Sequence, residues 1–251
     1  MMTCAGTGGP AAWIAMTSPA TADCGQAYTA GSARVSIRAE PTAGAVPGSS
    51  TVTKSATKMR GMDGRIIMLN GTSSAGKTTL AAALQTELVR AGECWIITGL
   101  DDFFSKLPPE WIRVGEQHVG EFADAGIAFD VVDGEIVRRV GPIGARVLVA
   151  YRSAVGAAAR AGLDVIVDEV LLSEQDWHGW VAELDGLDVL WVRVGIDLET
   201  VEARERERGD RLIGLARSQL DVVHQFPRYA VEVDTAVMDA RAAARAVLAA
   251  R

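Results

Sequence analysis

The chain contains few of the groups from which a disulfide framework or a metal centre is usually built. Its 251 residues include three cysteines and three histidines. The cysteines (Cys4, Cys24 and Cys94) have neither the spacing of a zinc site nor a paired pattern. A chain without such a framework is typical of a reduced compartment, so we expect a cytoplasmic protein.

Long apolar runs and an excess of positive charge are missing as well. No run approaches the roughly 18 residues of a membrane span, and the N-terminus lacks the basic start and long apolar stretch of a signal peptide. The formal net charge is −7, whereas a nucleic-acid-binding surface needs clustered Lys and Arg to meet phosphate backbones. We therefore expect neither a membrane nor a nucleic acid as a partner.

Residues 1–62 differ in composition from the rest of the chain. They are rich in Ala, Thr, Ser and Gly and show no sustained helical or strand period. Such a segment buries too little apolar surface to offset the entropy cost of ordering it. We predict a disordered tail over 1–62 and one folded domain over 63–251. A start codon at Met59 or Met62, and a targeting peptide, are the alternatives.

From Arg65 onward, short apolar strands alternate with helical stretches. This alternation is typical of a parallel sheet covered by helices on both faces, so we predict a three-layer α/β fold with five parallel strands. Ligands bind at the carboxyl ends of such strands, and residues that follow a strand become candidates for chemistry. The expected strands are Arg65–Asn70, Cys94–Thr98, Asp164–Asp168, Asp188–Val194 and Tyr229–Val233. The expected helices are Lys77–Ala91, Ile143–Ala161, Glu174–Leu184, Leu198–Arg208, Leu215–His224 and Ala236–Ala250.

An insertion at residues 108–141 interrupts the alternation. Within it, two strand-like runs (127–132 and 135–137) flank Asp133-Gly134. An Asp-Gly pair in this position indicates a tight hairpin. The insertion lies between the second strand and a long helix, where a cover for a substrate would be useful. A surface excursion without function is the alternative.

The most informative motif follows the first strand. Residues 71–78 fit G-x-x-x-x-G-K-[ST], the phosphate loop of nucleotide-binding proteins, and they lie between an apolar strand and a helical pattern, as that motif requires. The glycines let the backbone curl so that its N–H groups and the helix N-terminus hold phosphates. Lys77 adds a charge at the β- and γ-phosphates, and Thr78 offers a hydroxyl to Mg²⁺. The predicted nucleotide contacts are Gly71, Thr72, Ser73, Ser74, Ala75, Gly76, Lys77, Thr78 and Thr79.

Acidic residues follow the second and third strands. If the first two strands lie close in space, Asp101 can accept a proton from a hydroxyl that attacks the γ-phosphoryl group. Helix capping by Asp101 or Asp102 is the alternative. The third strand closes with Asp168, a pattern in which the Asp helps to hold Mg²⁺, and Glu169 could share that role. A capped strand end without metal is the alternative.

Arginines recur in residues 204–211. Arg204 and Arg208 lie four apart on one predicted helix face, and Arg211 follows Gly209, a hinge or helix end. Arginines that close over a phosphate site neutralise charge on the transferring group, so this segment is a candidate lid. A solvated helix with Glu–Arg pairs is the alternative.

Taken together, these residues resemble the chloramphenicol phosphotransferase-like family. The matching segments follow the family's order over about residues 65 to 236. They are Asn70-Gly71 with Ser73–Lys77, Gly99–Asp101, Ile166–Val170, Asp188–Val192, Arg208–Arg211, Val222–His224 and Val231–Thr235. Many nucleotide-binding proteins carry the glycine loop, whereas Gly-Asp-Arg followed by Val-Val-His and Val-Glu-Val-Asp-Thr is far more specific.

The resemblance implies a P-loop kinase with an adenylate-kinase-like core. Such an enzyme uses ATP and Mg²⁺ to phosphorylate a primary hydroxyl of chloramphenicol, in the context of antibiotic resistance. It implies that Asp101 is the catalytic base. It also implies that Lys77, with lid arginines from Arg204, Arg208 and Arg211, stabilises the γ-phosphoryl group during transfer.

The chain also departs from the family pattern. Asp102, Glu169 and Ala230 stand where a known member has Ser, Asp and Asp, and the insertion after Pro108 matches poorly. The acceptor would be recognised partly in that insertion. A kinase of another hydroxylated metabolite, or a nucleotide-dependent binding module without an acceptor, therefore remains an alternative. The sequence leaves a homo-oligomer open.

Overall fold

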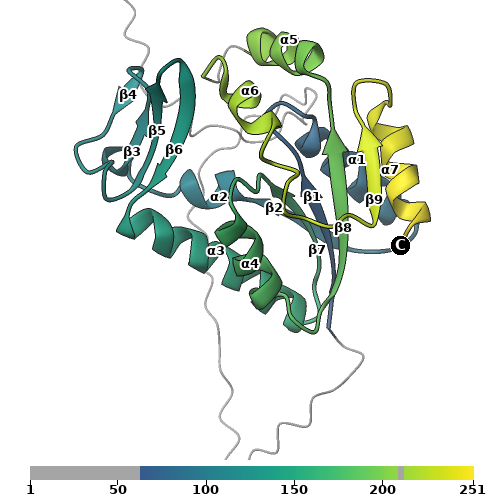
Figure 1. Cartoon of the computed structure of the whole chain (residues 1–251). Helices are drawn as coiled ribbons and strands as arrows, with labels where there is room; N and C mark the ends of the chain where they lie inside the picture. Colours follow the sequence, from purple (N-terminus) through teal and green to yellow (C-terminus); the bar gives the residue numbers. More distant parts are fainter. Residues whose placement is uncertain (1–62, 209–211) are drawn as a thin grey trace, which may run out of the picture. The chain divides into compact units, whose positions relative to one another are not determined.

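The structure is a computed structural model that describes residues 63–208 and 212–251 (Figure 1). The predicted disordered tail at 1–62, the predicted hinge at Gly209 and the lid residue Arg211 lie outside the described residues. Within the described part of the chain, no helix is long and apolar enough to cross a membrane.

Five parallel strands form the main sheet, in the order β2-β7-β1-β8-β9 (Figure 1). The strands lie close to the predicted bounds, and the predicted α/β fold with a five-stranded parallel sheet is confirmed. They are β1 (Arg65–Asn70), β2 (Trp95–Gly99), β7 (Asp164–Glu169), β8 (Asp188–Gly195) and β9 (Val231–Asp234).

The strand order corrects one assumption made from the sequence. The second strand does not lie beside the first, because β7 pairs with β1 on one side and with β2 on the other. Gly99, the last residue of β2, pairs with Asp168 of β7. The segment after β2, which contains Asp101, therefore lies next to the end of β7 and not directly beside the phosphate loop.

Helices cover both faces of the main sheet (Figure 1). Neighbouring side chains of a strand point to opposite faces. In β1, Ile67 and Leu69 pack in the core formed with α1 and α7, whereas Ile66 and Met68 pack in the core formed with α3 and α4. The bounds are α1 (Lys77–Arg90), α7 (Ala240–Ala249), α3 (Pro142–Arg160) and α4 (Glu174–Glu183).

The insertion folds into a second sheet, in the order β4-β3-β5-β6. The predicted hairpin is confirmed: Asp133 (φ 52°) and Gly134 (φ 83°) both adopt the left-handed conformation that a two-residue turn requires. Val114 and Ile136 of this sheet pack against Leu212 and Leu215. The elements are α2 (Leu100–Phe104), the short 3₁₀ helix Pro109–Trp111, β3 (Ile112–Val114), β4 (His118–Val119), β5 (Ile127–Val132) and β6 (Glu135–Val140).

Two helices are shorter than predicted, while α5 (Leu198–Arg208) has the predicted bounds. α6 (Leu215–Leu220) ends before His224, because the chain after it enters turns in which the Val223 carbonyl accepts a hydrogen bond from Asn70. α7 begins at Ala240 and not at Ala236, because Asp239 is its N-cap and accepts a hydrogen bond from the Ala242 N–H.

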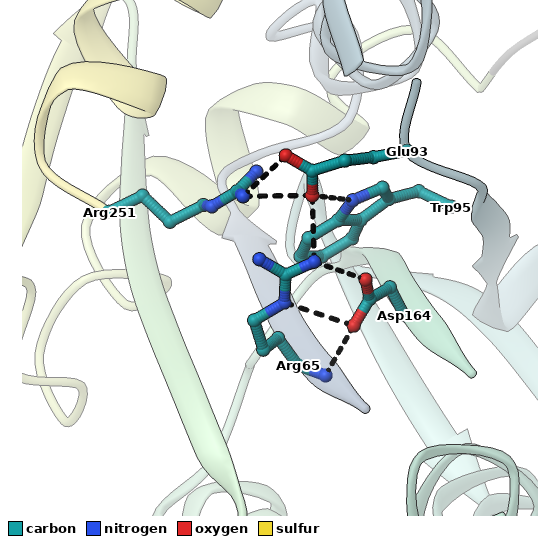
Figure 2. Close-up of polar contacts among 5 residues, drawn as sticks. All are labelled: Arg65, Glu93, Trp95, Asp164 and Arg251. Carbon is teal, nitrogen blue, oxygen red and sulfur yellow. Dashed lines mark hydrogen bonds and ion pairs between the residues drawn. The ribbon is translucent and has the colours of Figure 1, made fainter. Parts of the chain in front are cut away.

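A polar cluster joins the amino ends of three strands to the C-terminus of the chain (Figure 2). Glu93 accepts hydrogen bonds from Arg251 (2.7 and 2.8 Å), from Arg65 (2.7 Å) and from the Trp95 indole (3.1 Å). Arg65 also pairs with Asp164 through its side chain and its backbone N–H. Both guanidinium groups lie over the Trp95 ring. The cluster lies at the amino ends of the strands, at the opposite end of the sheet from the phosphate loop.

Glu93→Gln should lower the free energy of unfolding by about 1 kcal/mol at pH 7, because a neutral amide binds two arginines less strongly. Hydrogen bonds from Arg251, Trp95 and Arg65 lower the pKa of Glu93 from 4.5 to about 2. The stabilisation is therefore present above pH 4.5 and is lost as the pH falls through about 2.

Urea unfolding at pH 7 and pH 3 measures this effect. The difference in unfolding free energy between wild type and Glu93→Gln should be smaller at pH 3 than at pH 7. The control Glu135→Gln, at an exposed position, should have the wild-type unfolding free energy at both pH values. A difference that stays constant with pH would contradict the assignment.

Candidate active site

The phosphate loop joins β1 to α1 through a backbone that tolerates few side chains. A Cβ at Gly71 would lie 2.5 Å from the Val194 carbonyl oxygen, so only glycine fits this close approach to β8. Ser74 (φ 59°) and Gly76 (φ 85°) adopt the left-handed conformation, which is costly for a residue with a side chain. The loop therefore has the tight curl that the motif predicts.

The N-terminus of α1 has free donors. The first N–H groups of a helix have no intrahelical acceptor. Here the N-cap, Gly76, has no side chain to supply one, and the first turn contains no acidic residue. The hydroxyls of Thr72 and Ser74 are buried and have no hydrogen-bond partner within the described residues. Buried polar groups without partners are uncommon. These donors fit phosphate oxygens, so the loop fits a nucleotide.

The structure brings Lys77, Thr78 and Asp168 together, as the sequence predicts for a nucleotide and metal site. The Lys77 ammonium donates to the Thr72 carbonyl at 2.8 Å and lies 3.5 Å from Asp168 Oδ1. The Thr78 hydroxyl donates to Asp168 Oδ2 at 2.7 Å. Among the described residues, no group of three or more His, Cys, Asp or Glu could hold a metal. One carboxylate and one hydroxyl suit Mg²⁺, which keeps waters and binds substrate phosphates.

Glu169 does not join this group, because it points to the opposite face of β7. It is only 4% exposed, and its carboxylate accepts hydrogen bonds from the Trp180 indole (2.9 Å) and the Val170 N–H (2.7 Å). Burial raises the pKa of Glu169 to about 7. Burial, with the negative charges of Glu169 and Asp168, also raises the pKa of Tyr151. The expectation that Glu169 shares the metal role is therefore wrong.

The two adjacent acids after β2 have different environments. Asp102 accepts hydrogen bonds from the Gly99 N–H (2.8 Å) and the Thr98 hydroxyl (3.1 Å). The N-cap of α2 is Gly99, so the alternative in which Asp101 or Asp102 is the N-cap is wrong: both acids lie in the first turn, and the Asp102 carboxylate binds the N–H of the N-cap residue. Asp101 is exposed at the start of α2. A Cβ at Gly99 would lie 3.0 Å from the Asp168 carbonyl oxygen, so this segment runs close to the end of β7. The assignment of Asp101 as base stays a prediction.

Of the predicted lid arginines, the structure brings Arg204 to the phosphate loop. Its guanidinium donates to the Thr235 carbonyl (2.7 Å) and hydroxyl (3.2 Å), and Thr235 donates to the Ala75 carbonyl (2.8 Å). A Cβ at Gly76 would lie 3.5 Å from Arg204 Nη1. Arg208 is the exposed last residue of α5.

The alternative of a solvated helix with Glu–Arg pairs describes only part of α5. Glu202 pairs with Arg206 and with Arg217. Glu205, in contrast, is 1% exposed and accepts hydrogen bonds from the N–H groups of Gly214 (2.6 Å) and Ala216 (3.0 Å). The carboxylate of Glu205 therefore fastens α5 to the start of α6.

Sequence reasoning missed Gln219, whose side-chain oxygen accepts a hydrogen bond from the Ser73 N–H at 2.7 Å. Gln219 is 5% exposed, and it contacts a loop that lies 146 residues earlier in the chain. No spacing or motif marks this glutamine, so the sequence carried no signal that could have identified it.

Asn70 connects three segments behind the loop. Its side-chain amide donates to the Val223 carbonyl and to the Tyr229 hydroxyl, both at 2.7 Å, and its oxygen accepts from the Leu171 N–H at 2.9 Å. Tyr229 also pairs with His224, whose pKa burial lowers to about 4. These contacts give the Val-Val-His segment a structural role in supporting the loop.

Comparison with known proteins identifies the family of this chain. A family profile described as chloramphenicol phosphotransferase-like protein matches residues 64–251. Two proteins of Mycobacterium tuberculosis, from strains CDC 1551 and H37Rv, are each 34% identical to this chain over 179 residues. The match covers 70% of this chain and 78% of each relative, and both relatives are provisionally named O-phosphotransferases.

Solved structures of kinases share the fold. The APS kinase CysC of Mycobacterium tuberculosis, in complex with AMPPNP and APS, has a TM-score of 0.51 at 14% identity, over 75% of this chain and 97% of that chain. A sugar kinase from Janibacter sp. HTCC2649 has a TM-score of 0.51 at 16% identity, over 74% and 93%. These likenesses confirm the P-loop kinase fold. The chain is a P-loop phosphotransferase, and it belongs to the chloramphenicol phosphotransferase-like family.

Proposed function

We propose that this protein transfers the γ-phosphoryl group of ATP to a hydroxyl of chloramphenicol or of a related small molecule. The observation that carries the proposal is the N-terminus of α1, which has no side-chain cap. Beside it lie Lys77, Thr78 and Asp168 and two buried hydroxyls that have no partner among residues 63–208 and 212–251. Donors of this kind bind phosphate oxygens. Membership of a phosphotransferase family supports phosphoryl transfer as the reaction in which they take part.

The chain's own residues have distinct tasks in this proposal. The loop N–H groups and the hydroxyls of Thr72 and Ser74 bind phosphate oxygens, and Lys77 adds positive charge near the β- and γ-phosphates. Thr78 and Asp168 would hold Mg²⁺, which neutralises charge that develops on the phosphates. Because these groups are placed before the nucleotide binds, little reorganisation is needed at the moment of reaction.

The transfer itself uses Asp101 and Arg204. Asp101 accepts the proton of the acceptor hydroxyl. The hydroxyl oxygen then forms a bond to the γ-phosphorus while the bond from that phosphorus to the ADP oxygen breaks, and ADP leaves with the bonding electrons. Arg204 places a positive charge over the loop, where Thr235 holds it, and offsets charge on the transferring group.

Two classes of acceptor fit this proposal. The family description supports chloramphenicol as the acceptor, and another hydroxylated metabolite is the second candidate. Incubation of the protein with ATP and chloramphenicol tests the first acceptor. An absence of phosphorylated drug at high enzyme concentration would remove it, and ATP consumption without any second substrate would argue against an acceptor.

Asp101→Asn should lower turnover by about 10²- to 10⁴-fold, because an amide cannot accept the hydroxyl proton. Binding of an ATP analogue should not change. Asp102→Asn is the matched control, since an amide oxygen still accepts the capping hydrogen bonds from Gly99 and Thr98. Near-full turnover by Asp101→Asn in a steady-state assay would remove the base assignment.

Asp168→Asn should raise the Mg²⁺ concentration needed for half-maximal activity by about 10- to 100-fold, because the carboxylate that orients the metal and Thr78 is lost. A Mg²⁺ titration at fixed ATP measures the change. Asp133→Asn in the exposed hairpin turn is the control and should leave the titration unchanged. An unchanged Mg²⁺ requirement in Asp168→Asn would contradict a metal role for this carboxylate.

A further inference from the structure

A groove lies between the inserted sheet and the helices that follow it. It is lined by β5 and β6 of the inserted sheet, by α3, by the start of α4 and by α6, and its volume is about 630 Å³. This volume lies in the range of small-molecule sites. Gln219 lines the groove and accepts the hydrogen bond from the Ser73 N–H of the loop. Gln219 therefore links the groove to the loop where phosphates bind.

Apolar side chains form much of the groove's lining. Ile136 and Val140 of β6, Leu148 of α3, and Leu215 and Val222 at α6 all line it. Burial of apolar surface against such side chains favours a ligand with an apolar body. The inserted sheet supplies part of this wall, so the insertion contributes directly to the groove.

One arginine and one aspartate in the groove compensate each other's charge. Arg138 of β6 donates to Asp176 of α4 at 2.5 Å, and both side chains are 12% exposed. Asp176 also accepts a hydrogen bond from the Ser173 hydroxyl at 2.9 Å. Because Arg138 and Asp176 find their charge and hydrogen-bond partners within the protein, neither group favours the binding of a charged ligand.

Arg152 of α3 is different, because it lines the groove and has no hydrogen bond or ion pair with any described residue. Its guanidinium lies against Gly179 of α4, where a Cβ would be 2.9 Å from both Cζ and Nε. Glycine at 179 therefore makes room for this group. The guanidinium is partly exposed in the groove, and no described residue supplies an acceptor for it, so it can bind an anionic group of a ligand.

We propose that this groove binds the phosphoryl acceptor, and that Arg152 is a specificity-determining residue that selects acceptors carrying a carboxylate on an apolar body. The planar fork of arginine matches a carboxylate in two parallel hydrogen bonds. This inference rests on the proposed function, since the acceptor hydroxyl must reach the γ-phosphoryl group at the loop. Chloramphenicol is uncharged and would leave Arg152 without a partner.

Two probes of equal shape test the proposal on the full chain. They are 4-(hydroxymethyl)benzoate and 4-(hydroxymethyl)benzamide, which share the ring and the primary hydroxyl and differ in charge. Calorimetric titration in the presence of a non-hydrolysable ATP analogue should give at least about tenfold tighter binding of the benzoate, because hydrogen bonds to charged groups are the stronger ones. Uncharged chloramphenicol should bind no better than the benzamide.

Arg152→Met should abolish the preference for the benzoate while ATP-analogue binding stays unchanged. Arg146→Met is the matched control, because Arg146 is an exposed residue of the same helix and does not line the groove. Arg146→Met should keep the preference. A benzoate preference that survives in Arg152→Met would overturn the role of Arg152.

Gly179→Ala provides a second variant that keeps the arginine. Alanine is favoured over glycine inside a helix, so the melting temperature should not fall. The new Cβ displaces the guanidinium from its present position, so the benzoate preference should fall several-fold. An unchanged preference in a folded Gly179→Ala protein would overturn the proposed geometry.

The failure of this inference differs from the failure of the proposed function. Equal binding of the two probes, or no binding of either, in a protein that binds the ATP analogue overturns the inference alone. A protein that ignores ATP and its analogue overturns the proposed function, and this inference falls with it.

Discussion

The bend between β1 and α1 is the constraint on which the rest of the site depends. Gly71 touches the backbone of β8, and Ser74 and Gly76 turn the chain in the left-handed conformation. This path leaves the N–H groups in the first turn of α1 without intrahelical or capping acceptors, at the carboxyl end of the sheet. A helix N-terminus with open donors attracts phosphate through hydrogen bonds and through its dipole. Because the bend lies at the carboxyl ends of the strands, Lys77 and Asp168 are placed beside the phosphate-binding N–H groups.

Segments far apart in the chain hold this bend in place. Asn70 ties the end of β1 to the turns after α6 and to the start of the β7–α4 connection. Gln219 binds the N–H of Ser73, and Thr235 binds the carbonyl of Ala75 while it holds Arg204. A site whose supports are in place before the ligand arrives loses less entropy on binding. The segments around Val-Val-His and Asp-Thr, which mark the family, include Val223 and Thr235, two of the residues that make these contacts.

Much of the fold could be predicted from local signals. An apolar run bounded by turns indicates a buried strand, and Asp133-Gly134 indicates a hairpin because few other pairs tolerate two left-handed residues in succession. The order of the strands could not be predicted in this way. A continuous apolar run says that a strand is covered on both faces, and it does not say which strand lies beside it. The pattern therefore did not predict that β7 lies between β1 and β2.

The sequence by itself determined the phosphate loop, because its glycines, lysine and threonine act through the backbone of one short segment. It also indicated Asp168 as the acid that closes a buried strand. Only the tertiary structure decided that Glu169 faces the core, that Gln219 contacts the loop, and that Arg152 lies against Gly179. Each of these depends on which face of an element meets which neighbour. That choice is made by packing between distant segments, so no local pattern records it.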